Sequence, residues 1–117
     1  MEVPEVWELI AFFGHEPEPA DPEEAEFFGS LTFIFDIGGG DLLRCDIGAS
    51  YGDLRLALSR DGTERVVLSF EDVARLGVER LHGIETLVAS CGGEPDLREL
   101  RLSITPSVRI DWAKSQR

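Results

Sequence analysis

The sequence predicts an α+β fold in which antiparallel β-strands dominate and a short helix lies near the N-terminus. Three observations predict it. Apolar residues alternate with polar ones from residue 31 onward, glycine-rich turns separate the alternating segments, and helical spacing is clearest within residues 3–13. We expect about six to seven strands, joined as hairpins and a meander into a curved sheet or a partial barrel. A length of 117 residues predicts one domain over residues 1–117.

Residues 3–13 (VPEVWELIAFF) predict the helix. Its apolar residues at helical spacing are Val6, Leu9, Ile10 and Phe13. Pro4 suits the first turn of a helix, and Gly14 suits its end. We expect Trp7 and Phe13 to lie in the core.

Residues 15–26 form an acidic, proline-rich segment. Three closely spaced prolines prevent a helix or a central strand, so we expect an exposed loop. Residues 1–41 contain eleven of the 23 carboxylates and no Lys or Arg, whereas the rest of the chain is almost neutral. The net charge of −12 therefore arises mainly in the N-terminal third. Such a charge repels nucleic acid and anionic membranes and attracts a basic partner, although it also suits a surface that only confers solubility.

Residues 31–70 predict a four-stranded antiparallel meander. In residues 31–37, every second side chain is large and apolar, and the pattern returns in residues 42–47, 54–59 and 65–70. The short connections include Gly38-Gly39-Gly40 and Arg60-Asp61-Gly62-Thr63, which are typical of tight hairpins. Strands joined by such short connections pair as antiparallel neighbours.

The later part of the chain predicts further strands. Residues 84–91 alternate as one strand, and residues 100–104 pair with 108–112 as the last hairpin. Residues 71–82 fit two structures. Val73 and Leu76 suit a helical turn, whereas Leu76 and Val78 suit a strand, and we expect a helical turn followed by a short strand.

No spacing in the sequence predicts a catalytic, metal or cofactor site. Cys45 and Cys91 lie far apart, His15 and His82 have no ligand motif around them, and a bystander role is expected for each. The Gly38–Gly40 run lacks the lysine of a phosphate-binding loop. We expect a protein that is not an enzyme and holds no cofactor or metal.

The composition predicts a cytoplasmic protein. No stretch approaches the roughly 20 apolar residues that span a bilayer. The sequence starts Met1-Glu2-Val3-Pro4-Glu5, without the basic region of a secretory signal. Cys45 and Cys91 are then expected to be buried free thiols.

Three segments together resemble small bacterial immunity proteins of polymorphic toxin systems. They are residues 7–14 (WELIAFFG), residues 67–78 (VLSFEDVARLGV) and the terminal strand that ends Ile110-Asp111-Trp112. The resemblance implies a non-catalytic protein that binds and blocks a cognate toxin, often a basic nuclease. It implies no particular binding residues.

The charge pattern does point to candidate residues for contact with a protein partner. Carboxylates steer a basic partner, and exposed aromatic rings anchor it. The candidates are Glu16, Glu18, Asp21, Glu23, Glu24, Glu26, Phe27 and Phe28. Two alternatives remain open: a structural or assembly protein that associates through a sheet edge, and a domain that binds a small ligand.

Overall fold

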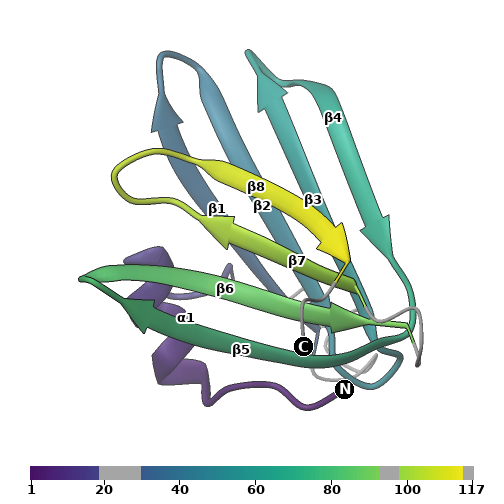
Figure 1. The fold of residues 1–117 in the computed structure, drawn as a ribbon. Coiled ribbons are helices and arrows are strands. Elements are labelled where there is room, and N and C mark those ends of the chain that lie inside the picture. Colours follow the sequence, from purple (N-terminus) through teal and green to yellow (C-terminus); the bar gives the residue numbers. More distant parts are fainter. Residues whose placement is uncertain (19–29, 93–97, 115–117) are drawn as a thin grey trace.

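The computed structural model describes residues 1–18, 30–92 and 98–114 (Figure 1). Within them the chain forms one helix, α1 (Val6–Phe13), and eight strands. The predicted class, mainly antiparallel β with a short N-terminal helix, is confirmed. No helix within these residues has the length and apolar character to cross a membrane.

The first sheet is the predicted meander. It comprises β1 (Ser30–Gly38), β2 (Asp41–Gly48), β3 (Asp53–Arg60) and β4 (Thr63–Phe70), paired in that order and antiparallel throughout. Side chains in register alternate between the two faces of the sheet. One row across all four strands, Phe33, Cys45, Leu56 and Leu68, belongs to the apolar face.

The second sheet is also a meander in chain order. It comprises β5 (Val73–Leu81), β6 (Ile84–Cys91), β7 (Arg98–Ser103) and β8 (Arg109–Lys114). A row of its apolar face is formed by Leu76, Ala89, Leu100 and Trp112. The strand predicted at 84–91 and the last hairpin are therefore confirmed.

Residues 73–81 form a strand, so the helical turn expected there is wrong. The register between β5 and β6 shifts between Val73 and Arg75, which marks a β-bulge. The extra residue resets the alternation, so Val73 and Leu76 both point into the core and are 2% and 3% exposed. A spacing of three, which in the sequence resembles a helix, is here the result of a bulge in a strand. The N-terminal segment forms hydrogen bonds at the bulge. Glu2 donates its N–H to the Ala74 carbonyl, and the Glu2 carbonyl accepts the N–H of Leu76.

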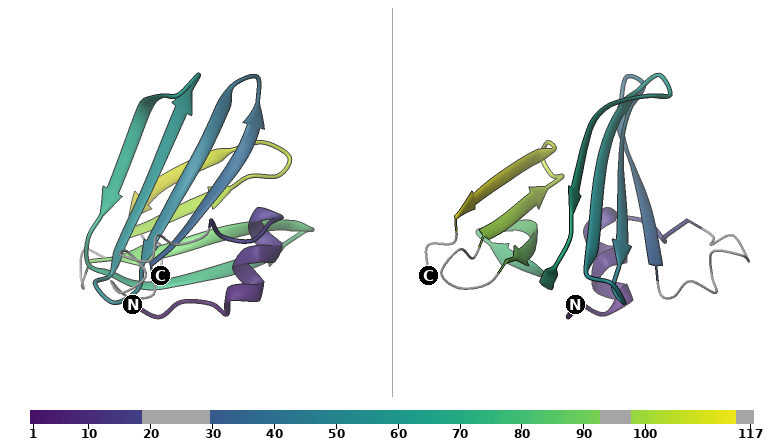
Figure 2. Two further views of the ribbon diagram at one scale, coloured as in Figure 1. Left: turned by 180° about the vertical axis from the view of Figure 1, so that it is seen from behind. Right: turned by 90° about the vertical axis from the view of Figure 1, so that its right-hand side faces the viewer.

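The two sheets pack face to face, with the strands of the second crossing those of the first at a steep angle (Figures 1 and 2). Buried side chains from both sheets and from α1 form a single apolar cluster. The strands that were expected in a curved sheet or a partial barrel are thus divided between two open sheets. The chain changes layer between Phe70 and Val73, where Asp72 takes the left-handed conformation with φ 58°.

Helix α1 lies at the side of the two layers, in contact with β1, β5 and β6 (Figure 2). Leu9, Phe12 and Phe13 are buried, and the Phe13 ring stacks on Phe33 at a centroid distance of 4.6 Å. Gly14 ends the helix as predicted, at φ 83° and with its N–H donated to the Ile10 carbonyl. Pro4 precedes the helix rather than forming its first turn.

The core position expected for Phe13 is confirmed, but that expected for Trp7 is wrong. Trp7 is 67% exposed, and Val6 beside it is 45% exposed. Eight residues of helix can bury only one face, and Leu9, Phe12 and Phe13 occupy that face.

The corner between the layers generates a stability prediction. Gly52 adopts φ +72°, and a Cβ there would lie 3.1 Å from the Val73 carbonyl oxygen. We expect Gly52→Ala to lower the free energy of unfolding by about 1–3 kcal/mol, because it adds backbone strain and disturbs the hydrogen bond from Val73 N–H to the Gly52 carbonyl. Urea denaturation measures it. Gly77→Ala is the matched control, since no atom lies within 4 Å of its added Cβ. Equal midpoints for the two variants would contradict a strained corner.

Candidate protein-binding surfaces

The described part of the predicted acidic segment is exposed and leads from α1 to the first sheet. Glu16 and Glu18 are exposed, and Glu18 donates its N–H to the Thr32 carbonyl on the edge strand β1 at 2.8 Å. The remaining candidates lie outside the described residues; they are Asp21, Glu23, Glu24, Glu26, Phe27 and Phe28. Glu18 and Ser30, the described residues on either side of the segment 19–29, therefore lie on the same edge of the first sheet.

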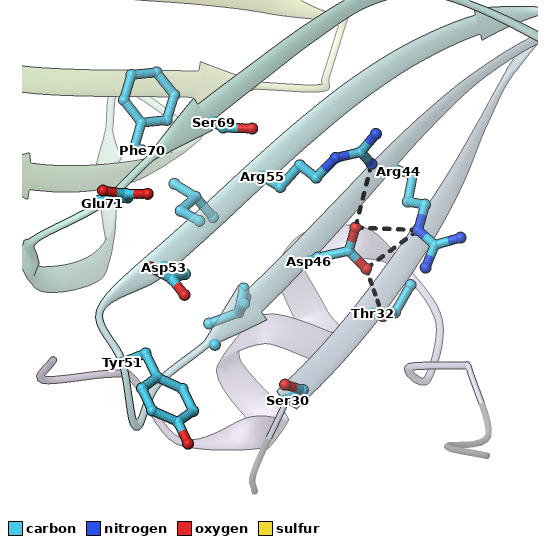
Figure 3. Close-up of a pocket in the computed structure, with 13 residues that line it drawn as sticks. Ser30, Thr32, Arg44, Asp46, Tyr51, Asp53, Arg55, Ser69, Phe70 and Glu71 are labelled. Carbon is cyan, nitrogen blue, oxygen red and sulfur yellow. Dashed lines mark hydrogen bonds and ion pairs between the residues drawn. The ribbon is translucent and has the colours of Figure 1, made fainter. Parts of the chain in front are cut away.

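Next to this edge, a cavity of about 590 Å³ opens on the outer face of the first sheet (Figure 3). A row of polar side chains in register crosses it: Thr32, Asp46, Arg55 and Ser69. These are the positions that alternate with the core side chains, so the same period that builds the core also places this polar row outside.

Asp46 is the centre of the polar row. It accepts a hydrogen bond from Thr32 at 2.7 Å and a bifurcated one from Arg44 Nε, which lies 3.1 Å from both carboxylate oxygens, and the Arg55 guanidinium lies 3.7 Å away. Arg55 also donates to Glu64 at 2.8 Å, and that hydrogen bond raises the pKa of the arginine. Figure 3 shows Thr32, Arg44 and Arg55 pointing toward Asp46. A carboxylate held in this way is a fixed structural charge, since its oxygens already accept bonds from its neighbours.

The lower rim of this cavity is acidic and aromatic. Tyr51 is 69% exposed, and Asp53 and Glu71 beside it are exposed carboxylates (Figure 3). Tyr51 lies in the tight turn between β2 and β3, and its place at this cavity becomes evident only when the strands are paired.

A second hollow lies near the tips of the first sheet's hairpins. It measures about 450 Å³ and is lined in part by Ile37, Leu58, Val66 and Val108. Arg60 forms a bidentate ion pair with Asp41 at its margin, with bonds of 2.7 and 3.1 Å. The hydrogen bond from Arg60 lowers the pKa of Asp41, and the pKa of Arg60 is raised in return.

Most arginines of the described residues are paired with carboxylates of the same chain. Besides the pairs above, Arg80 meets Glu85 at 2.9 Å, Arg101 meets Glu79 at 2.6 Å and Arg109 meets Asp111 at 2.9 Å. These exposed pairs contribute little to stability. They do neutralise the cationic side chains, so the surplus negative charge stays with unpaired carboxylates.

The described residues bring together no group of three or more His, Cys, Asp and Glu that would hold a metal ion. His82 is exposed in the β5–β6 turn, and His15 contacts the neighbouring Glu16 carbonyl through Nδ1. Cys45 and Cys91 are buried free thiols, as predicted. Burial raises the pKa of both, and for Cys45 the nearby Asp46 carboxylate raises it further. A nucleophilic cysteine requires the opposite shift, because only the thiolate reacts.

Comparison with models of known protein families gives no match, and comparison with curated protein sequences gives none. Among solved structures, the chain is similar to a chain of the contact-dependent growth inhibition toxin–immunity protein complex from Klebsiella pneumoniae 342. The TM-score is 0.83 at 15% sequence identity, and the match covers 97% of this chain and 96% of the other. At this identity the likeness establishes the fold. It supports, at the level of fold, the resemblance to immunity proteins that the sequence suggests.

The burial of the thiols predicts how the free energy of unfolding depends on pH. In the unfolded chain a thiol ionises near a pKa of about 8.5, while Cys45 in the folded chain keeps its proton to higher pH. Above that pKa the folded state binds more protons than the unfolded state, so the free energy of unfolding falls as pH rises, by about 1.4 kcal/mol per pH unit for one thiol. Urea denaturation under reducing conditions between pH 8 and 10 measures the slope. We expect Cys45→Ala to be less stable at neutral pH but to lose stability more slowly as pH rises. Identical slopes would contradict the raised pKa.

Proposed function

We propose that this chain is a bacterial immunity protein that binds a cognate toxin domain in the cytoplasm and blocks it without catalysis. The observation that carries the proposal is the fold match to a chain of a toxin–immunity protein complex, which extends over 97% of this chain and 96% of the other. The three sequence segments that resemble immunity proteins support it independently.

The matched structure is a complex of a toxin and an immunity protein. The features of the described residues favour the immunity protein, which is the inhibitor, as the one that this chain resembles. A toxin that acts as an enzyme needs a nucleophile, a general base or a bound metal that is accessible to substrate. Here both thiols are buried with raised pKa, and Asp46 is occupied by Thr32, Arg44 and Arg55. An inhibitor requires only a complementary surface.

The charge of the chain supports a basic toxin, such as a nuclease. A nuclease domain binds the phosphates of its substrate with Lys and Arg side chains at its active site. An acidic protein competes with the substrate for these basic side chains. Among the ion pairs of the described residues, Asp41 and Glu2 are the members that come from residues 1–41, so most of the negative charge of this part of the sequence is not offset by those arginines.

A small-ligand domain is the second candidate, and the cavity beside Tyr51 is the observation that favours it. Its central charged groups are bonded to one another, which leaves the hydroxyls of Ser30 and Ser69 and the rim to contact a ligand. Such a cavity can equally form the floor of a protein interface, and the fold match to a chain of a toxin–immunity protein complex supports the protein-binding function.

A growth assay tests the proposed function. The toxin domain encoded next to this chain is expressed in a sensitive host, with and without this chain. We expect the toxin domain alone to stop growth, co-expression to restore it, and the two proteins to co-purify as a complex. An immunity protein of unrelated fold serves as control and should not rescue. Toxicity that persists during co-expression, or a non-toxic neighbour, would contradict the proposal.

The acidic segment generates a kinetic prediction. Replacing Glu16, Glu18, Glu23 and Glu24 with Gln should slow association with the toxin domain by about three- to tenfold at low salt and flatten its dependence on salt, because the carboxylates steer a basic partner. Stopped-flow measurements of the association rate check it.

The control removes the same four charges elsewhere, by Asp53→Asn, Asp61→Asn, Glu71→Gln and Asp72→Asn. Asp61 and Asp72 have φ 50° and 58°, which asparagine also tolerates. An equal slowing by both sets would show that steering is not specific to the acidic segment, and no slowing by either would exclude steering.

A further inference from the structure

Helix α1 is apolar on both of its faces. In its sequence VWELIAFF, Glu8 is the single charged residue. Leu9, Phe12 and Phe13 face the core, yet the outward positions Val6, Trp7 and Ala11 are apolar and exposed as well. A helix that packs on a core with one face normally carries polar side chains on the other, and a helix that is apolar all round is normally buried all round. The outward face of α1 therefore has the composition of a contact surface.

Trp7 is the most prominent side chain of this face. It is 67% exposed, and Val3 and Val6 close by are 42% and 45% exposed. Tryptophan is the residue most enriched among those that dominate the binding energy of protein interfaces, because it buries a large area at small cost in conformational entropy. An exposed tryptophan on a rigid helix is ready for that role without rearrangement.

The surface next to Trp7 is hollowed, and a second hollow adjoins the first. One cavity of about 230 Å³ is lined by Trp7, Glu8, Ala11, Val78, Arg80 and Glu85. Another of about 460 Å³ is lined in part by Glu2, Val3, Glu8 and Arg75. Both include Glu8 and Val78, so they adjoin. A partner can thus place side chains beside the indole as well as on it, which is how a central anchor becomes fully desolvated.

The charges around this face specify the partner. Arg80 is paired with Glu85 at 2.9 Å, and Arg75 lies 3.9 Å from Glu2. Glu5 and Glu8 form no ion pair with the described basic side chains, so the rim is negative overall. A second copy of this chain would bring the same carboxylates against one another, which is unfavourable. A partner with Lys or Arg around an apolar pocket complements both features.

We propose that the outward face of α1, formed by Val6, Trp7 and Ala11 and extended by Val3 of the preceding segment, with Glu5 and Glu8 at its rim, is the anchoring contact for a basic toxin domain. This inference rests on the proposed function and deepens it. Trp7 enters an apolar pocket of the toxin, and the two glutamates pair with basic side chains around that pocket. The acidic segment after the helix accelerates the encounter, whereas the helix face holds the complex together.

The experiment compares two aromatic residues of equal exposure. Trp7 is 67% exposed on α1, and Tyr51 is 69% exposed on the rim of the sheet cavity. The toxin domain is inactivated by a substitution. Surface plasmon resonance then measures how tightly Trp7→Ala and Tyr51→Ala bind to it. We expect Trp7→Ala to raise Kd about 30-fold or more, mainly through faster dissociation, and Tyr51→Ala to change it less than threefold.

Folding is checked separately. Because Trp7 is largely exposed, we expect Trp7→Ala to unfold at nearly the same urea concentration as the wild-type chain. Trp7→Phe, which keeps an aromatic ring, should recover part of the affinity. Glu5→Gln with Glu8→Gln should slow association and weaken its salt dependence.

The outcomes separate this inference from the proposed function. If the wild-type chain neither rescues growth nor binds the toxin domain, both are overturned. If it rescues and Trp7→Ala binds as tightly as wild type, the function stands and the assignment of the helix face is overturned; a strong effect of Tyr51→Ala would then move the contact to the sheet cavity. If light scattering shows a dimer that Trp7→Ala dissociates, the face mediates self-association, and the inference is likewise overturned.

Discussion

The structure depends on the burial of two apolar sheet faces against each other. Each four-stranded meander has one apolar face, and neither face can remain in water. Helix α1 covers the side of the two layers that is bordered by β1, β5 and β6, where it buries Leu9, Phe12 and Phe13. The stacking of Phe13 on Phe33 ties the helix to the first sheet. Across the layers, Phe70 of β4 packs against Trp112 of β8 at a centroid distance of 4.9 Å.

This burial determines the character of the remaining surface. Because strand side chains alternate, the rows between the core rows face outward, and on the first sheet one of these outward rows contains the linked set of Thr32, Asp46 and Arg55. Carboxylates and guanidiniums that face each other across strands neutralise one another. The helix follows a different rule. Its buried face is fixed by three residues, so the apolar residues beyond them, Trp7 above all, have no place in the core.

The sequence was sufficient for most of the strands and insufficient for three features that depend on tertiary context. Period-two alternation and tight turns predict β1 to β4 because those signals are local. Val73 and Leu76 misled the prediction because a bulge in β5 spaces two core residues by three, and nothing local distinguishes that spacing from a helical turn. Trp7 was assigned to the core because a large apolar residue usually belongs there; its exposure follows from the narrow gap that α1 fills. The division into two layers depends on the corner at Asp72, whose backbone conformation the sequence does not reveal.

Long-range charge and short-range apolar contact would contribute separately to tight binding by a small acidic protein. Charge acts at a distance, so carboxylates in a segment beside the contact accelerate the encounter, but salt screens them and their exposed pairs add little affinity once formed. Apolar contact acts only at close range and slows dissociation. In this chain the two are adjacent but distinct: α1 ends at Gly14, and the exposed Glu16 and Glu18 follow directly. Because the helix is fixed to the core through its inner face, the outer face is held in place before any partner arrives, and binding requires little ordering of the protein itself. An inhibitor that must act before its toxin finds a substrate benefits from both properties, a fast approach and a rigid anchor.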